Sequence, residues 1–135
     1  MTTYVDARTA IVGYMHPAIS TGFPTTKVFY ENTVQVDLDT VGSSFIQVSV
    51  DFQDAVREGV DAMPYSKTYG VLTLRIFSKE GQGTKETLQM FDWLTSLLKY
   101  RILSGVTLDC PRPGKKVSRD GWSSADLIVD FSFWH

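Results

Sequence analysis

Hydrophobic residues recur at helical spacing near the start of the chain. They fall three and four residues apart, which predicts one apolar stripe on a helix, at Val5, Ala7, Ala10, Ile11, Tyr14 and Met15. Thr3 and Asp6 stand at the spacing of a capping box, which satisfies backbone N–H groups at a helix start. Pro17 lacks the N–H that a helix interior needs, so we expect this helix to kink or stop near His16.

A second helical pattern covers residues 84 to about 103. Its expected buried stripe comprises Leu88, Phe91, Leu94 or Thr95, Leu98 and Ile102, and it is widened by Met90, Trp93 and Leu97. So broad an apolar stripe requires a sheet face to cover it.

Elsewhere apolar and polar residues alternate with the period of two that is typical of strands. The pattern predicts strands at residues 33–39, 45–52, 69–77, 105–110 and 125–134. Only a few residues separate the first two, which favours an antiparallel pair. The chain is therefore predicted to be α+β, in the order α-β-β-β-α-β-β. We expect a mostly antiparallel or mixed sheet of about five strands, with two helices packed on one face, in a single domain over residues 1–135.

Two stretches show no strong period. Residues 53–68 predict a long polar loop, and loops of this length in compact domains are usually functional or disordered until bound. Residues 111–121 predict a second loop, whose positive charges come from Arg112, Lys115, Lys116 and Arg119, with no acidic residue before Asp120. This loop is either a solvated hairpin tip or a finger that contacts an acidic partner surface or passing nucleic acid. Trp122 at its base is either a partner anchor or a core residue.

Composition narrows the class of protein. A length of 135 residues suits one domain, and the fractions of hydrophobic residues (43%) and charged residues (21%) are ordinary for a soluble globular chain. The net charge of -2 argues against a dedicated nucleic-acid binder. No apolar run approaches the length that spans a bilayer, and no secretory signal is apparent. Cys110 is the single cysteine, which excludes an intrachain disulfide and fits a reducing cytoplasm.

The glycine-containing stretch "SKEGQGTKET", residues 78–87, is the one candidate for a nucleotide-binding loop of an enzyme. A phosphate-binding loop of Walker A type needs a lysine directly after its last glycine, but Gly83 is followed by Thr84 and only then by Lys85. A dinucleotide fingerprint would need a third glycine where Glu86 stands. We therefore interpret the stretch as a strand-to-helix turn with Thr84 as the helix cap, and we expect no saturable ATP or GTP binding.

The remaining reactive residues form no catalytic pattern. His16 precedes a proline at the expected helix end, His135 is terminal, and Cys110 alternates with apolar residues as a buried structural thiol would. Asp37 and Asp39 alternate along one strand, where a wet strand face is the usual reason for such a pair. We expect no catalytic residue, metal site or cofactor.

Three motifs follow the short N-terminal helix. They are "VFYENTVQVDL" (28–38), "YGVLTLRIFSKEGQGTKETLQMFDWLTSLL" (69–98) and "GWSSADLIVDFSFW" (121–134). In this order and at this total length they resemble the tail terminator proteins of long-tailed bacteriophages, the group typified by the lambda tail terminator. The chain departs from the pattern at Glu31, where relatives often carry proline.

The resemblance implies a non-enzymatic virion protein, assembled in the host cytoplasm. Such a subunit forms a ring, generally a hexamer, at the head-proximal end of the tail tube. The ring ends tube polymerisation and offers a joining surface to head completion or neck proteins, while genome DNA passes through without sequence-specific binding. In this interpretation, the candidate contacts with neighbouring subunits, the tube or the connector lie in residues 53–68 and 111–121. They include Arg112, Lys115, Lys116, Arg119 and Trp122. The alternatives are a neck or head completion protein and, more remotely, a small nucleotide-binding enzyme using residues 81–85.

Overall fold

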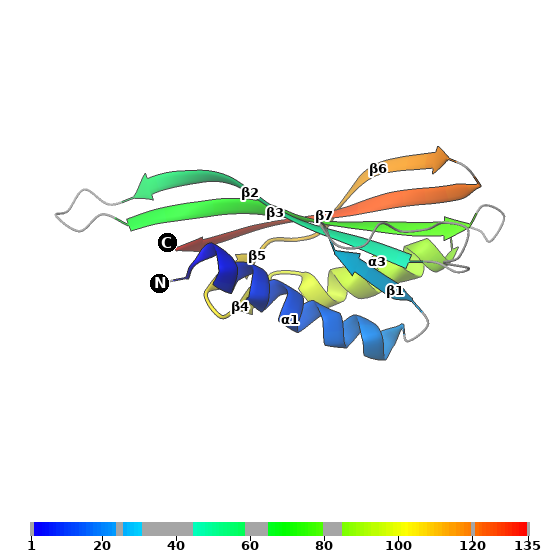
Figure 1. Ribbon diagram of the computed structural model, residues 1–135, viewed down its shortest axis with the longest axis horizontal. Helices are drawn as coiled ribbons and strands as arrows, with labels where there is room; N and C mark the ends of the chain where they lie inside the picture. Colours follow the sequence, from blue (N-terminus) through cyan, green and yellow to red (C-terminus); the bar gives the residue numbers. More distant parts are fainter. Residues whose placement is uncertain are drawn as a thin grey trace.

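The computed structural model describes residues 2–23, 26–30, 45–58, 65–79, 85–119 and 121–134. Its elements (Figure 1) are α1 (Tyr4–Gly22), β1 (Lys27–Tyr30), β2 (Phe45–Glu58), β3 (Tyr65–Lys79), α3 (Lys85–Leu98), β4 (Ile102–Leu103), β5 (Val106–Leu108), β6 (Arg112–Arg119) and β7 (Trp122–Trp134). The predicted strand at residues 33–39 and its antiparallel pairing lie outside the described residues. The prediction of an α+β chain with a mixed sheet is confirmed. The number of strands, their order and the details of helix packing differ from the prediction.

The described strands form one seven-stranded sheet in the order β1-β2-β3-β7-β5-β4, with β6 also paired to β7. β1 runs parallel to β2, and the other pairs are antiparallel. β5 and β6 share one edge of β7, because β5 pairs with its residues 131–133 and β6 with its residues 122–128. The expectation of about five strands was therefore too low.

One core joins both helices to the sheet. α1 contributes buried Ala7, Ile11, Met15 and Ile19; α3 contributes Met90, Leu94 and Leu98; and the strands contribute Ile46, Val48, Val50, Leu72, Leu74, Ile76, Val106, Leu108, Leu127, Val129, Phe131 and Phe133. The predicted alternation in β2, β3 and β7 is confirmed by this set, apart from Phe52, which is half-buried. Figure 1 shows both helices below the sheet. No described helix is long and apolar enough to cross a membrane.

The first helix begins as predicted but does not stop at His16. The Asp6 amide donates to the Thr3 hydroxyl (3.1 Å) and the Thr3 amide donates to the Asp6 carboxylate (3.3 Å), which confirms the capping box. α1 then continues through Pro17 to Gly22. Ile19 is fully buried two residues past the proline, so core packing of this last turn outweighs the lost backbone hydrogen bond.

The second helix ends earlier than predicted. Tyr100 has a left-handed backbone conformation (φ 53°) that a continuing helix does not allow. Ile102 belongs to β4 and is 73% exposed, and Leu88 is 51% exposed, so neither lies in the buried stripe. Ser104 (φ 48°) and Gly105 (φ 91°) form the two-residue turn between β4 and β5, which positive φ angles at both positions favour.

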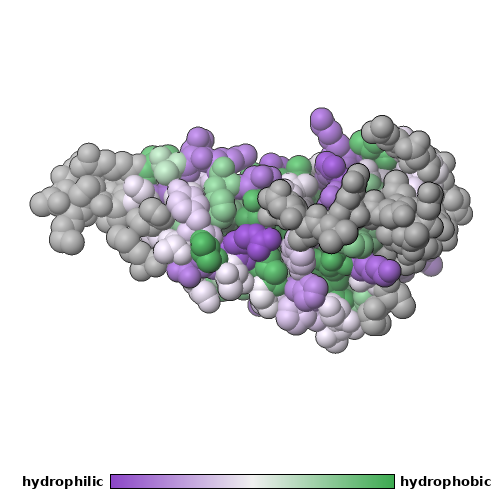
Figure 2. All heavy atoms as spheres, in the orientation of Figure 1, coloured by the Kyte–Doolittle hydropathy of each residue, from purple (hydrophilic) through white to green (hydrophobic). Residues whose placement is uncertain are grey.

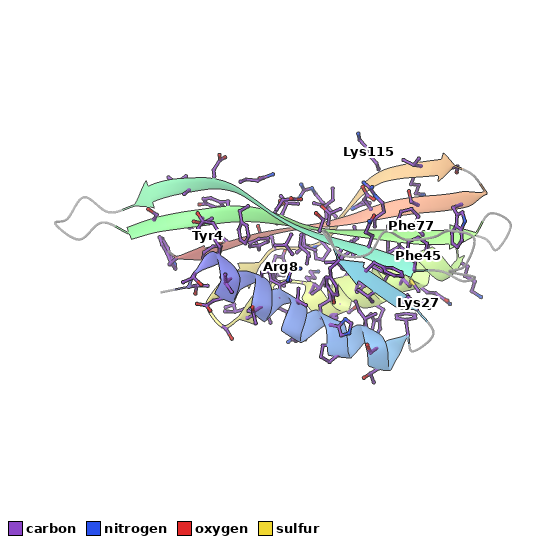
Figure 3. The ribbon with its side chains drawn as sticks, viewed as in Figure 1. Tyr4, Arg8, Lys27, Phe45, Phe77 and Lys115 are labelled. Atoms are coloured by element: carbon purple, nitrogen blue, oxygen red, sulfur yellow. The ribbon has the colours of Figure 1, made fainter. Side chains whose placement is uncertain are left out.

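A second, smaller apolar cluster lies on the other face of the sheet. Phe45 precedes Ile46 in β2, so its side chain points away from the helices. Phe45 and Trp122 are buried there, with Phe29 and Phe77 packed against them. The Phe45 and Phe77 rings stack at 4.5 Å between centroids, and Figure 3 shows them facing each other close to β1. Apolar side chains therefore pack on both faces of the sheet at this end.

Both stretches predicted to be loops contain strand. Residues 53–58 extend β2, and residues 65–68 begin β3, which pairs with them as far as Glu58 and Tyr65. Residues 112–119 form β6 rather than a loop. Hydrogen bonding to a neighbouring strand, which has no local signature in these polar sequences, is the physical reason for both corrections. The molecule is elongated as a result, with the β2–β3 hairpin at one end and the β6–β7 hairpin at the other (Figure 1).

Candidate assembly surfaces

Two strand edges at opposite ends of the molecule carry opposite charge. We call β6, residues Arg112–Arg119, the basic edge. We call residues 49–58 of β2, the part beyond its pairing with β1, the acidic edge. Four of the five residues singled out from the sequence, all except Trp122, lie on the basic edge.

The basic edge is a strand bound on one side. It pairs with β7 and, within the described residues, with no other strand. Its register shifts between Pro113 and Lys116, which is the sign of a β-bulge. Lys115 and Lys116 are exposed and form no ion pair with described residues. Lys115 points away from the body of the molecule (Figure 3).

Arg112 differs from the two lysines because its charge is already paired. Its guanidinium donates to the carboxylate of Asp130 on β7, and both side chains are about half exposed. This ion pair ties the start of β6 to its neighbour strand. The free positive charge of the described basic edge therefore lies at Lys115 and Lys116; the side chain of Arg119 lies outside the described part.

A second ion pair lies beneath the basic edge. The Arg75 side chain donates two hydrogen bonds to Asp126, from Nε (2.8 Å) and from Nη2 (3.3 Å). The hydrogen bond to Asp126 raises the pKa of Arg75 above its ordinary value, against a lowering by burial, and the attraction between the charges adds to the rise. Asp126 is itself only 7% exposed, so a buried carboxylate is satisfied here.

Gly114 allows the bulge of β6 to lie close over β7. A Cβ atom at this position would come within 2.7 Å of Ile128 Cδ1 and 3.0 Å of Asp126 Cβ. A larger residue would have to displace the end of the Ile128 side chain and would crowd Asp126. The lysines of the basic edge are thus presented by a strand held at fixed register.

Trp122 does not join the exposed part of this edge. It is 7% exposed, and its ring lies 5.4 Å from that of Phe45 in a T-shaped contact. Of the two interpretations of this residue, the structure places it in the core.

The acidic edge also lacks a neighbour along its length. β1 pairs with β2 only as far as Val48, and among the described residues no strand continues beyond it. Asp51 and Asp54 are exposed and make no ion pair with described residues. Ser49 donates a hydrogen bond to Asp51 (3.1 Å), and Val56 is 46% exposed. In the coloured part of Figure 2, hydrophilic residues recur along the upper rim of the molecule, where Figure 1 draws β2 and β6.

The residues considered for catalysis are not brought together. His16 Nδ1 lies 2.7 Å from the Tyr30 hydroxyl, and the Arg8 guanidinium lies 5.9 Å from the Tyr30 ring centroid, which makes a packing contact between α1 and β1. Cys110 was predicted to be buried, but it is partly exposed just beyond the end of β5, where its thiol donates to the Pro111 carbonyl (3.6 Å). Within the described ranges no three His, Cys, Asp or Glu side chains form a metal-binding group.

The glycine turn itself lies mostly outside the described residues, as do Asp37, Asp39 and His135. Its flanks are described: Ser78 at the end of β3 is buried, and its hydroxyl lies 3.4 Å from that of Thr87 in α3. This contact joins strand and helix at the turn. The predicted cap at Thr84 stays a prediction.

Comparison with known proteins gives the fold and nothing further. No protein-family model matches the chain, and no curated protein matches it by sequence. Ten chains of known structure are similar to it. One of them aligns with a TM-score of 0.71 and 13% sequence identity over 93% of this chain and 92% of the other, and its name states no function. At this identity the likeness shows a shared α+β fold alone.

Proposed function

We propose that this protein is a tail terminator of a long-tailed bacteriophage: a structural subunit that closes into a ring, generally a hexamer in that family, at the head-proximal end of the tail tube. The ring would end tube polymerisation and offer the joining surface for a head completion or neck protein. Genome DNA would pass through it without sequence-specific contact.

One observation carries the proposal: the sequence segments that resemble tail terminators coincide with the frame of the fold. β3 and β7 are neighbours in the middle of the sheet and pair from Lys67–Trp134 to Lys79–Trp122. β1 and α3, which belong to the same segments, pack on this frame. The resemblance therefore concerns the residues that determine the architecture rather than a peripheral motif.

The surface supports an assembly role as well. A closed ring of identical subunits needs two different surfaces on each subunit, one for each neighbour. The basic edge and the acidic edge lie at the two ends of an elongated subunit and would suit two such surfaces. The described residues offer, by contrast, no cluster of metal-binding side chains.

The experiment that tests this function measures tail-tube length. Tube protein is polymerised with and without the purified chain, and tube lengths are measured by electron microscopy. We expect the chain to bind one end of each tube and stop its growth. Unlimited growth with no end-bound density would contradict the proposal.

The main alternative, a neck or head completion protein, differs in its partner. Such a protein binds the portal side of the joint rather than the tube. Pull-down of the purified chain with isolated tubes and with portal-bearing heads separates the two: binding to heads alone would favour the alternative.

A further inference from the structure

We propose that the acidic edge of one copy of this chain docks against the basic edge of the next copy, so that two sheets join edge to edge. The partner is thus a second copy, and the contact is heterologous. The inference rests on the proposed function only for the closure of the contact into a ring, because edge pairing between copies stands on the geometry below.

Both edges are open where the contact would form. β6 pairs only with β7, and β2 beyond Val48 pairs only with β3, among the described residues. Open strand edges expose backbone N–H and C=O groups with which another strand can pair, and the proline, the bulge and the lysines of β6 discourage pairing with an uncharged or basic edge. Pro113 has no N–H to donate, which confines new pairing on the basic edge to residues 114–119.

The charges of the two edges are complementary. Lys115 and Lys116 are exposed cations on one edge, and Asp51 and Asp54 are exposed anions on the other. None of the four has an ion-pair partner within the described part of its own chain. Opposite charges placed across a contact select the partner and its register, while like edges repel each other. Pairing of two like edges, basic on basic or acidic on acidic, is therefore disfavoured.

Each edge also carries an exposed valine beside its charges. Val117 on the basic edge is 50% exposed and Val56 on the acidic edge is 46% exposed. Branched apolar residues on an open strand gain most from a cross-strand neighbour. The same contact that pairs the charges would remove these two side chains from water.

The strand directions permit the contact. β2, β3, β7 and β6 alternate in direction, so β2 and β6 are antiparallel to each other within one chain. A neighbouring copy that continued the sheet in the same sense would bring its β2 antiparallel to β6. The two edges lie at opposite ends of the long axis (Figure 1), so successive copies would overlap end to end as a ring requires.

The same geometry makes the test specific, because the two edges of one chain cannot reach each other. β3 and β7 lie between β2 and β6, which separates them by about 14 Å at the usual strand spacing. The two charged sites are also offset along the strands. Through Val71, Asp51 is level with Asp130 of β7, whereas Lys116 is level with Ala125 of β7. A zero-length link between these charged residues must therefore join two copies.

The experiment mixes unlabelled and ¹⁵N-labelled full chain, couples amines to carboxylates with a carbodiimide, and identifies the joined peptides by mass spectrometry. We expect links from Lys115 or Lys116 to Asp51 or Asp54 that contain one labelled and one unlabelled peptide. The absence of such links at concentrations where other intermolecular links form would overturn the proposal.

Charge reversal provides the second arm. Reversing the charges of either edge should lower association between copies by roughly tenfold or more, measured by analytical ultracentrifugation. The two variants are Lys115→Glu with Lys116→Glu on the basic edge, and Asp51→Lys with Asp54→Lys on the acidic edge. The chain that carries all four changes should associate again. Lys85→Glu with Lys99→Glu, exposed residues away from both edges, makes the same charge change and should leave association unaltered.

Circular dichroism checks that each variant is folded. If the fourfold variant stays dissociated while folded, or the control pair dissociates equally, the edges are not the contact. Tube capping is scored separately on the same samples. If the unaltered chain caps tubes but shows no edge contact, this inference alone fails. If it makes the edge contact but does not cap tubes, the proposed function alone fails.

Discussion

At Gly70 the absence of a side chain is required by the packing of the core. A Cβ there would lie 2.3 Å from Phe131 Cζ and 2.7 Å from the backbone oxygen of Asp51. Gly70 is directly opposite Phe131 in the β3–β7 pair, so the Phe131 ring covers the strand where the side chain would be. Gly13 in α1 is the opposite case, since a Cβ there would meet no atom within 4 Å.

These two glycines give a matched pair of predictions. Gly70→Ala should lower the free energy of unfolding by about 1–3 kcal/mol, because a crowded core must move the ring or the strand. Gly13→Ala should raise it by about 0.5–1 kcal/mol, because alanine restricts the unfolded chain and suits a helix interior. Urea unfolding of both variants measures the difference; equal effects at the two positions would contradict the packing described.

Trp122 shows why a residue type alone does not define a contact. An aromatic residue beside a basic stretch suits a partner anchor and a core position equally well in a sequence. Which one applies depends on Phe45, more than seventy residues earlier in the chain, whose ring packs against it. Only strand register brings these two residues together.

At the scale of elements, the apolar spacing predicted the existence of α1 and α3 and located β2, β3 and β7. The C-terminal ends of the two helices were less well predicted. The stop at His16 was inferred from a local rule about proline, and the burial of Ile19 overrides it. The Ser104–Gly105 dipeptide was a usable turn signal for the β4–β5 hairpin, but the helical pattern extended over residues 99–103 concealed it.

The continuous α1 predicts the effect of removing its proline. Pro17→Ala restores an N–H that can donate to the Gly13 carbonyl and removes the clash of the ring with that carbonyl. We expect the free energy of unfolding to rise, by up to about 3 kcal/mol, the penalty of an interior proline. Thermal unfolding followed by circular dichroism measures this. A loss of stability would mean that the proline itself fixes the path of α1 against the sheet.

At the scale of the whole molecule, the two stretches interpreted as loops became the distinguishing features of the shape. Both hold strand at opposite ends of the sheet, and residues 53–58 of the first and 112–119 of the second have an open edge among the described residues. The charges noticed in the sequence at Lys115 and Lys116 stay exposed, whereas the charge of Arg112 is paired with Asp130. Of these candidate contacts, Arg112 already has an ion-pair partner within the chain, and the role of the set as partner contacts stays a prediction.

The role of the basic edge in the assembled particle is testable in the virion. Replacing Lys115, Lys116 and Arg119 by glutamate should weaken tail joining and lower the yield of infectious particles by at least roughly tenfold, as expected when close charge pairs across a contact become repulsive. Because Lys115 and Lys116 are exposed, the variant should unfold at nearly the wild-type urea concentration. Normal infectious particles from this variant would rule out an assembly role for the edge.

The sequence by itself determined the class of fold, the inward faces of the central strands and the capped start of the first helix. It could do so because hydrophobic spacing and caps act over a few neighbouring residues. Only the tertiary structure decided that β1 runs parallel to β2, that residues 112–119 form a strand and that Trp122 is buried. These depend on hydrogen bonds and packing between segments far apart in the chain, to which a polar stretch such as "RPGKKVSR" gives no local clue.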